Sequence, residues 1–458
     1  MSEKRAVILD ALLPDDKGLK PVNDIICELL EQNGYDVLIF QLNELNLNHC
    51  IGCFGCWIKT PGVCIIHDDA QKIHKEIMQS DSVVLVTPVS FGGYSSQLKK
   101  IIDRLIPNIL PHFNYYHDEI HHIPRYLHYP KLIAIGIQDN SDNHETNTFK
   151  LLVGRNAMNL KFPDYSVEVV SNKDSLNTIR NQIQNLFNRN DKWPLKEDIL
   201  PLMSLTMPEI SDINFESSGK ALLIIGSPKT KKSSTSAVLG NTFLERLNIK
   251  GWETESLTLN KNIMEEKGHS HLLSAVDNAD LIVFTFPLYI DALPFLVIKS
   301  LELIAAQRMA LKNLSNKRIF IIVNSGFPES YQNSLALSIC NNFAVKCGFT
   351  WCGALAMGSG EAICSGQPLN KGNSFSRPPG NHIVNALNIA GDAIAKTDPV
   401  PQSVQKLISK SPIPILPFSI WRWIFIKMGN LWWQKQSNEN GVSKQDMLKR
   451  PYEVIRDS

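Results

Sequence analysis

Two stretches in opposite halves of the chain share one pattern, and no other feature constrains the fold as strongly. The letters TPVSFGGYSSQLKKIIDR (Thr87–Arg104) align with FPLYIDALPFLVIKSLEL (Phe286–Leu303). Each stretch follows an apolar run typical of a buried strand and leads through a loop into a helical pattern. Strand and helix patterns alternate on both sides of each stretch, which is typical of a parallel sheet. The sequence therefore predicts an internal duplication of one α/β domain.

The predicted architecture is α/β, with two doubly wound parallel five-stranded sheets, helices on both faces of each, and a Trp-rich C-terminal tail. We expect one domain over residues 1–190 and a second over 219–398. A Pro-containing linker over 191–218 joins them, and the tail covers 399–458. The ten expected strands are Arg5–Leu12, Asp36–Leu42, Ser82–Thr87, Lys131–Ile137, Tyr165–Val170, Lys220–Gly226, Thr254–Leu259, Asp280–Phe286, Arg318–Asn324 and Thr350–Met357.

The charge of the chain is balanced, with 46 Lys and Arg against 45 Asp and Glu. This balance argues against a broad surface for nucleic acid or for acidic substrates. The start, MSEKRAVILDALL, lacks the apolar core and the cleavage site of a signal peptide, so we expect a cytoplasmic protein. A reducing compartment suits a chain with free thiols.

Four cysteines lie close together in the stretch HCIGCFGCWIKTPGVCIIHDD: Cys50, Cys53, Cys56 and Cys64. Soft thiolates at this spacing suit zinc or an iron–sulfur cluster, and two intervening glycines allow the tight backbone that such a site needs. The compact run favours a 4Fe–4S cluster, because the cysteine pairs of zinc ribbons usually lie farther apart. Zinc, a redox-active dithiol and unligated structural cysteines stay open as alternatives.

The cysteine run, its following Asp-Asp pair and the FGG…S…LK..IDR element together resemble the iron–sulfur flavoproteins and the related NAD(P)H-dependent FMN reductases of the flavodoxin-like superfamily. The second half resembles the same family through GSPK…SS, FPLY and NSGFPE. The likeness covers roughly residues 5–190 and 220–395. It implies a five-stranded parallel sheet in each half, FMN at the carboxyl ends of the strands, and electron exchange between the flavin and the cluster.

The terminal phosphate of FMN needs a loop of small residues at the start of a helix, where backbone N–H groups and hydroxyls can bind it. The stretch GSPKTKKSSTS meets this need, although an ordinary polar turn is the alternative. The expected binding residues are Gly226 for close approach, Ser227, Ser233, Ser234 and Thr235 as donors, and Lys229 as counter-charge. The equivalent loop of the first half, ALLPDDKGLKP, lacks hydroxyls, and Asp15 and Asp16 would repel a phosphate.

The isoalloxazine ring of the flavin needs a flat slot with backbone donors. By resemblance, one wall in the second domain is Pro287, Leu288, Tyr289 and Ile290, and the other is Asn324, Ser325, Gly326 and Phe327. The first-domain counterparts are Pro88, Val89, Ser90, Phe91, Gly92 and Gly93, which either cover a flavin held by the other half or support the cysteine loop.

These differences predict a division of labour between the halves. The first half keeps the cluster, and the second keeps the phosphate loop. Because members of the family commonly pair as homodimers, the two halves are expected to mimic such a dimer, with the cluster of one near the flavin of the other. Whether the whole chain also forms a homodimer stays open.

The predicted function is a flavin-dependent oxidoreductase of the NAD(P)H-dependent FMN reductase type. The donor would be NAD(P)H, bound transiently, or a small carrier such as ferredoxin, and the acceptor a small molecule or a redox protein. The alternatives are an FMN reductase without a cluster and a non-catalytic zinc- or thiol-binding interaction protein.

Two further segments invite interpretation. The His-rich insertion Pro107–Pro130 is expected to be a lid or interface segment rather than a metal site, with Arg125 as a candidate for an anionic ligand. The tail, with Trp421, Trp423 and a Trp-Trp pair among basic residues, is expected to pack on the body or on a partner. A helix at a membrane interface is the alternative.

Overall fold

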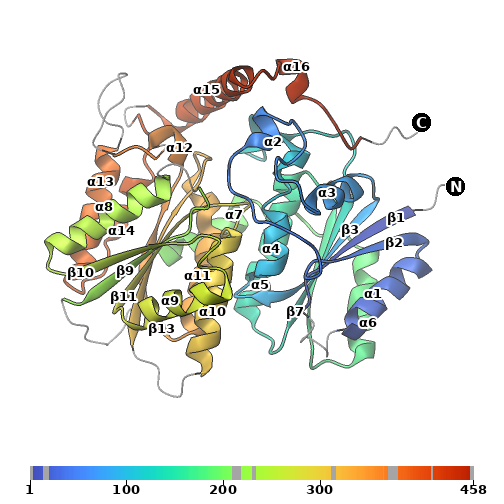
Figure 1. Cartoon of the computed structure of the whole chain (residues 1–458), viewed down its shortest axis with the longest axis horizontal. Coiled ribbons are helices and arrows are strands. Elements are labelled where there is room, and N and C mark those ends of the chain that lie inside the picture. The colour runs from blue at the N-terminus through green and yellow to red at the C-terminus, as the bar shows by residue number, and fades with distance from the viewer. Residues whose placement is uncertain are drawn as a thin grey trace. The chain divides into compact units, whose positions relative to one another are not determined.

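A computed structural model describes residues 4–13, 20–208, 218–229, 234–310, 316–364, 366–369, 380–413 and 416–453. The chain divides into two compact units. The first unit is Met1–Leu195 with Ile426–Ser458, and the second is Lys196–Phe425. Each unit contains its own parallel sheet (Figure 1).

The sheet of the first unit has the strand order β2-β1-β3-β7-β8, and all these neighbours pair in parallel. A two-residue strand, β4, pairs antiparallel with the end of β3. This sheet consists of β1 (Lys4–Asp10), β2 (Tyr35–Gln41), β3 (Ser82–Ser90), β4 (Gly93–Tyr94), β7 (Lys131–Gln138) and β8 (Tyr165–Ser171).

The sheet of the second unit has the order β10-β9-β11-β12-β13, again all parallel. In both units the first strand lies between the second and the third, which is the flavodoxin-like order. The two predicted parallel sheets are therefore confirmed. This second sheet consists of β9 (Lys220–Ile225), β10 (Glu253–Thr258), β11 (Leu281–Pro287), β12 (Lys317–Asn324) and β13 (Phe349–Met357).

Helices cover both faces of each sheet. Central parallel strands such as β12 are therefore buried along their whole length. In the first unit α1 and α6 pack side by side, and α5 packs against β8, β4 and β3. The helices of this unit before the tail are α1 (Lys20–Gln32), α2 (Gly55–Ile58), α3 (Ala70–Met78), α4 (Ser96–Ile102), the 3₁₀ turn η2 (Ile106–Asn108), α5 (Asn143–Leu160) and α6 (Leu176–Phe187).

In the second unit α8 and α13 pack side by side, as α1 and α6 do in the first. The ring of Phe243 on α8 stacks on that of Phe320 on β12, with centroids 5.1 Å apart. The helices of this unit are α7 (Lys196–Ile199), η3 (Leu200–Thr206), α8 (Thr235–Ile249), α9 (Glu266–Asp277), α10 (Phe295–Ala310), η4 (Ser330–Asn333), α11 (Ser334–Lys346), α12 (Gly360–Ile363), α13 (Asn381–Ala395) and α14 (Gln402–Ile408).

The duplicated stretch makes the same turn in both units. In the first unit the two central turn residues, Phe91 and Gly92, have φ values of 59° and 84°. In the second unit the aligned residues, Ile290 and Asp291, have φ values of 46° and 56°. Because side-chain-bearing residues seldom adopt positive φ, the shared conformation supports the predicted duplication.

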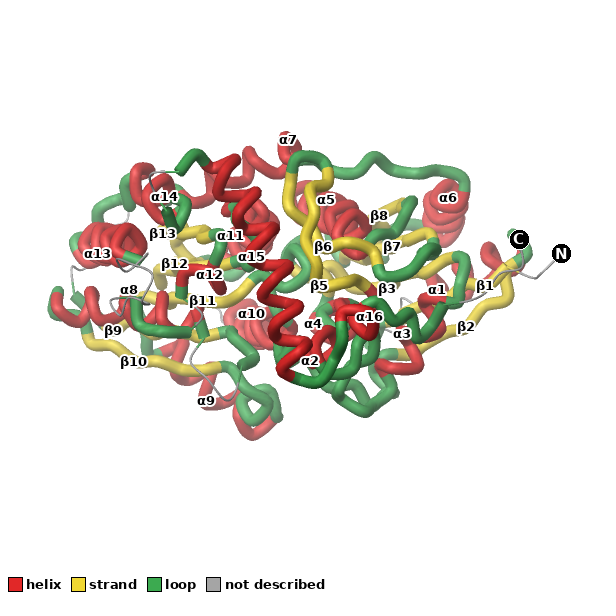
Figure 2. The backbone as a smooth tube through the Cα atoms, turned by 90° about the horizontal axis from the view of Figure 1, so that it is seen from above, coloured by secondary structure: helices red, strands yellow, loops and turns green. Residues whose placement is uncertain are grey.

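Three segments differ from the simplest expectation. The His-rich insertion forms an antiparallel hairpin, β5 (Ile109–Tyr116) and β6 (Glu119–Pro124), visible as two adjacent strands in Figure 2. Part of the expected linker is ordered as α7 and η3, and the Trp351 side chain donates a hydrogen bond to the carbonyl of Leu205 there. The tail contains α15 (Phe418–Glu439) and α16 (Lys444–Met447), and the division between the units falls inside α15. No helix among the described residues is both long and apolar enough to cross a membrane.

A buried histidine on α3 should make the protein sensitive to acid. Burial and the nearby charge of Arg104 lower the pKa of His74 from 6.5 to about 3, and neither ring nitrogen has a hydrogen-bond partner among the described residues. Between those two pH values the unfolded chain holds a proton that the folded chain lacks, so stability falls as the pH falls, by about 1.4 kcal/mol per unit. His74→Leu should remove about 2 kcal/mol of the loss between pH 7 and pH 5.

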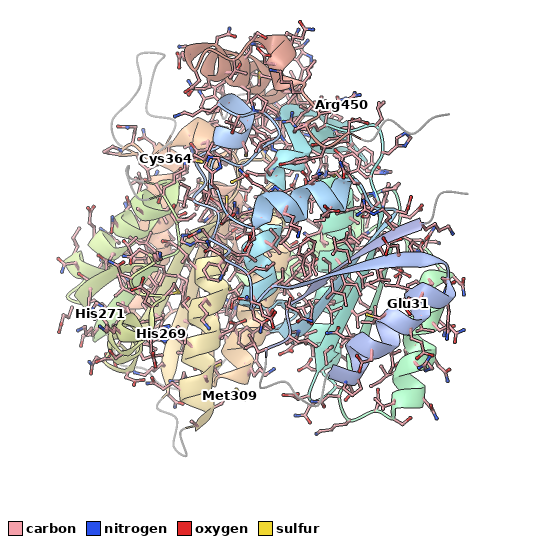
Figure 3. All side chains as sticks on the ribbon, turned by 45° about the vertical axis from the view of Figure 1, so that its right-hand side comes forward. Glu31, His269, His271, Met309, Cys364 and Arg450 are labelled. Atoms are coloured by element: carbon pink, nitrogen blue, oxygen red, sulfur yellow. The ribbon has the colours of Figure 1, made fainter. Side chains whose placement is uncertain are left out.

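Urea unfolding of wild type and variant at pH 7 and pH 5 measures this difference. His271→Leu is the matched control, since His271 is exposed on α9 (Figure 3). An equal loss of stability in wild type and His74→Leu would contradict the assignment.

Candidate cofactor sites

The four clustered cysteines meet in one place in the first unit. Together with apolar side chains they line a single cavity, whose walls are Cys50, Ile51, Cys53, Phe54, Cys56, Cys64, Ile65, Ile66, Arg104, Ile106 and Pro107. The sequence spacing thus corresponds to a real convergence of thiols. That they bind a metal cluster stays a prediction.

Local backbone geometry brings the thiols together. Gly52 has a φ of 62° and Phe54, at the start of α2, has one of 54°, so the chain reverses sharply between the cysteines. A Cβ on Gly55 would lie 2.7 Å from Cγ2 of Ile65, so only glycine fits at this contact. The N–H of Gly55 donates to Sγ of Cys53 over 3.4 Å.

A buried arginine reaches the cysteine cavity, which the sequence analysis did not foresee. Nη2 of Arg104 lies 3.4 Å from Sγ of Cys64. The same guanidinium donates to the Asp68 carboxylate and to the Asn48 carbonyl, which hold its orientation. Its positive charge lies beside a sulfur that would be negative as a metal ligand. Arg104 is the last residue of the duplicated stretch Thr87–Arg104. The sequence motif therefore included this arginine but did not indicate that it contacts Cys64.

Ionising the buried thiols costs free energy unless a positive group such as Arg104 or a bound metal balances the charge. Burial raises the pKa of Cys50 to about 12 and also raises the pKa of Cys56, and the other thiols of the group add to both effects. In the described ranges, no three His, Cys, Asp or Glu side chains come close enough to enclose a single metal ion. A four-iron cluster is larger than one ion and holds its thiolates farther apart. The four thiols that line this cavity are the soft donors that such a cluster takes.

The C-terminal part of the tail covers the cysteine loop. The ring of Trp433 lies 5.2 Å from that of Phe54 and 5.1 Å from that of Trp57, measured between centroids. Val442 and Met447 belong to the same buried cluster as Cys56. The tail therefore encloses the loop in apolar side chains.

The candidacy of Arg125 as a ligand for an anion is wrong. Its guanidinium is buried and donates to the carbonyls of Pro107, Met447 and Lys449 at distances of 2.7, 2.9 and 2.7 Å. These bonds fasten the tail to the hairpin segment. In the opposite direction, Nε of Arg450 (labelled in Figure 3) donates a hydrogen bond to the carbonyl of Arg125 over 2.8 Å.

Removing the tail tryptophan should open this enclosure. Trp433→Ala should lower the free energy of unfolding of the first unit by about 3 kcal/mol, because a large buried ring leaves a cavity. It should also speed the loss of any bound cluster in air. Urea unfolding and the decay of absorbance after aeration measure the two effects. Trp432→Ala, at the more exposed neighbour, is the control, and an equal effect of both substitutions would refute the role of Trp433.

In the second unit the β9–α8 connection begins with a glycine that packs closely against β11 and α10. The N–H of Gly226 donates to the carbonyl of Thr285 over 2.7 Å. A Cβ on Gly226 would lie 2.2 Å from Cγ2 of Val297, so no larger residue fits. The side chains of Ser227, next to this glycine, and of Thr235, the first residue of α8, are both buried.

The other predicted phosphate ligands divide into three cases. Ser234 is the N-cap of α8, and its side chain accepts from the N–H of Ala237 over 3.1 Å. Lys229 forms an ion pair with Glu361, with Nζ and Oε1 2.7 Å apart, so a phosphate would compete with this carboxylate. Ser233 lies outside the described residues. A glycine step, hydroxyls, a helix start and one lysine together fit a phosphate.

The predicted ring-binding segments of the second unit lie next to each other. The N–H of Leu288 donates to the carbonyl of Asn324 over 2.8 Å, which joins the two walls at their base. The Asn324 side chain accepts from the hydroxyl of Ser236 over 2.7 Å, a contact that sequence reasoning missed. Among the described residues, apart from its two chain neighbours, none has an atom within 4 Å of the point where a Cβ on Gly326 would stand, so the second wall borders open space there.

The remaining wall residues are placed by the backbone. Pro287 ends β11 and pairs with Asn324 on β12. Tyr289 pairs with Ala292 across the turn that contains Ile290. The carbonyl of Phe327 accepts from the N–H of Ser359 over 2.7 Å.

The corresponding connection of the first unit has a buried carboxylate at its start. Ala11 stands where the second unit has Gly226, since its N–H likewise donates to the neighbouring strand. Asp10 is 2% exposed, and its carboxylate accepts from the N–H of Leu12 over 2.9 Å and from Nδ2 of Asn23 over 2.5 Å. A phosphate here would meet the carboxylate of Asp10, which already accepts from the N–H of Leu12. Asp15 and Asp16, expected to repel it, lie outside the described residues.

The first-unit counterparts of the ring walls lie in β3, in β4 and in the turn between these strands. Pro88 lies in β3 opposite Ile137, and Ser90 and Gly93 flank the β3–β4 turn. A Cβ on Gly92 would lie 2.7 Å from Cβ of Thr148 on α5, so this turn is packed against a helix. Phe91 is buried at the same turn.

The His-rich hairpin contains a buried ionic network. Oε2 of Glu119 accepts from Arg155 over 2.6 Å and lies 3.0 Å from Nε2 of His121. Burial would raise the pKa of Glu119, but the hydrogen bond to His121 and the charge of Arg155 outweigh it and lower the pKa to about 2. The hairpin and the end of α5 also line a pocket of about 450 Å³. The interpretation as a lid stays a prediction.

Comparison with known proteins matches each half separately. Residues 21–118 match the family model of NADPH-dependent FMN reductases, and residues 219–362 match that of the flavodoxin-like fold. An iron–sulfur flavoprotein of Methanocaldococcus jannaschii is 40% identical over 78 residues, which are 17% of this chain and 39% of that protein. One of Archaeoglobus fulgidus is 32% identical over 84 residues, 18% of this chain and 37% of that protein.

The chain thus spans about two fifths of the length of these curated relatives. Among solved structures, an NAD(P)H:quinone oxidoreductase from Methanothermobacter marburgensis is similar over 40% of this chain and 100% of its own length. The identity is 14% and the TM-score 0.32, so the fold rests on the strand order and not on this likeness.

Proposed function

The chain is a tandem of two flavodoxin-like domains, and on that premise we propose that it is a flavin-dependent oxidoreductase. FMN would bind at the β9–α8 loop of the second unit, and a 4Fe–4S cluster would bind the four cysteines of the first. NAD(P)H or a small electron carrier would reduce the flavin. Electrons would then pass through the cluster to an acceptor.

One observation carries this proposal: the two units have complementary sets of binding groups. The first unit gathers four thiols around one cavity, and at the end of β1 the buried carboxylate of Asp10 accepts from the N–H of Leu12. The second unit has Gly226 after β9, followed by the hydroxyls of Ser227 and, at the start of α8, of Ser234 and Thr235. The names of the relatives, iron–sulfur flavoproteins, join an iron–sulfur group and a flavin in one protein.

The residues of the chain would bind and orient, while the cofactors supply the redox chemistry. When bound, FMN accepts a hydride and releases single electrons. Gly226 lets the backbone approach the phosphate, and Ser227, Ser234 and Thr235 supply hydroxyls. Arg104 would balance charge at the cluster through Cys64. Trp433 and its neighbours would exclude water from the cysteine cavity.

Anaerobic purification followed by analysis of flavin, iron and acid-labile sulfide tests the proposal. We expect one FMN and one four-iron cluster per chain, flavin bands with a broad cluster shoulder, and bleaching of both by NADPH, NADH or reduced ferredoxin. A colourless protein with bound zinc would establish the non-catalytic alternative instead. Flavin without iron or sulfide would leave only an FMN reductase with an empty thiol loop.

A further inference from the structure

Helix α15 exposes an unusual concentration of large apolar side chains. Leu431, Met428 and Trp423 are 66%, 61% and 58% exposed, whereas large apolar side chains are usually mostly buried. Where exposed apolar side chains adjoin one another, they mark a contact site more often than chance. The exposed large apolar residues of this helix are Phe418, Ile420, Trp423, Met428, Leu431 and Trp432.

The exposure does not arise from a loosely attached helix. The side chain of Trp421 is buried and donates from Nε1 to the hydroxyl of Ser359 over 3.2 Å. Trp433 is likewise buried, against Phe54 and Trp57. One side of α15 is therefore fastened. The other side presents Ile420, Trp423, Lys427 and Leu431, which are spaced by three or four residues and so share one face.

The charges on this segment have one sign. Between Asp398 and Glu439 the sequence has no acidic residue, and it has five basic ones: Lys406, Lys410, Arg422, Lys427 and Lys435. Lys427 and Lys435 are exposed on α15 itself. An exposed apolar stripe flanked by lysines complements a surface that is apolar below and negative above.

We propose that this exposed face of α15 binds the surface of an anionic lipid bilayer. Trp423 would lie at the level of the headgroups, where an aromatic ring with a polar N–H is favoured. Lys427 and Lys435 would contact lipid phosphates, and Leu431 would enter the acyl boundary. A second copy of the chain fits less well, because pairing this face with itself would oppose lysine to lysine. This inference is independent of the proposed redox function.

Vesicle co-sedimentation of the purified full chain tests the proposal. We expect wild type to bind DOPC vesicles containing about one-third DOPG and to bind pure DOPC at least about fivefold more weakly. Trp423→Gln/Leu431→Gln should reduce partitioning onto the anionic vesicles by about tenfold or more, because both apolar contacts are lost. Lys427→Gln/Lys435→Gln should remove most of the preference for DOPG.

Met309→Gln is the matched control, an equally exposed apolar residue on α10 (Figure 3). It should leave binding unchanged, and circular dichroism should show that all variants keep the fold. Absence of vesicle binding by wild type, or equal loss in the control, overturns the proposal. So does a wild-type dimer that Trp423→Gln/Leu431→Gln converts to a monomer, because the face would then join two copies of the chain.

Discussion

Cys56→Ser should remove iron and acid-labile sulfide from the purified protein and leave FMN in place. Cys56 is the most deeply buried of the four thiols in the cavity, and serine is a poor ligand for iron. A cluster that loses one of four ligands in a buried site is expected to dissociate during purification. The flavin should stay because its predicted ligands belong to the second unit.

Iron, sulfide and flavin analysis of anaerobically purified variant and wild type measures this outcome. Cys27→Ser is the matched control, since Cys27 is a half-buried thiol on α1 of the same unit outside the cavity. We expect the control to retain all three components. Full iron content in Cys56→Ser, or loss of flavin along with the iron, would show that the cofactors are not divided between the units as proposed.

Ser227→Asp should produce the opposite result, weakening FMN binding by about a hundredfold or more while iron and sulfide stay. The substitution places a carboxylate in the β9–α8 loop, much as Asp10 stands at the corresponding loop of the first unit. A like charge placed against a bound phosphate costs several kcal/mol, and each 1.4 kcal/mol is about tenfold in affinity.

Titration of flavin-free protein with FMN, followed by quenching of flavin fluorescence, measures the affinity. Ser270→Asp is the control, because Ser270 is exposed on α9 and outside the predicted site. Wild-type affinity in Ser227→Asp would place the phosphate elsewhere. Flavin that stays with the protein in Ser227→Asp but is lost in Cys56→Ser would assign FMN to the first unit.

The fold was accessible from the sequence because its elements have strong local patterns. All ten predicted strands exist, since buried parallel strands read as apolar runs between turn residues. The hairpin of β5 and β6 was not predicted as strands. Its His- and Tyr-rich letters alternate weakly, and its side chains are buried only by packing against residues such as Arg155 and the tail.

The candidate sites were accessible only in part. Spacing was enough to group the four cysteines and to single out the loop after β9. It did not reveal the bond from Arg104 to Cys64, the bond from the Leu12 N–H to the Asp10 carboxylate, or the bonds from Arg125 to carbonyls of the tail. Each of these contacts depends on a specific partner. The identity of a charged residue does not indicate whether its side chain binds a ligand or a buried group of the protein.

Residue order alone was thus sufficient for the duplicated α/β pattern, the four thiols and the polar loop, because these are encoded within a few turns of chain. Tertiary packing decided which polar groups are already satisfied and which faces stay exposed. The tail shows the difference most clearly. Trp433 is buried on the cysteine loop and its neighbour Trp432 is exposed, although the two are adjacent and identical in type. Burial depends on what the rest of the chain places opposite each side chain, and no local pattern contains that information.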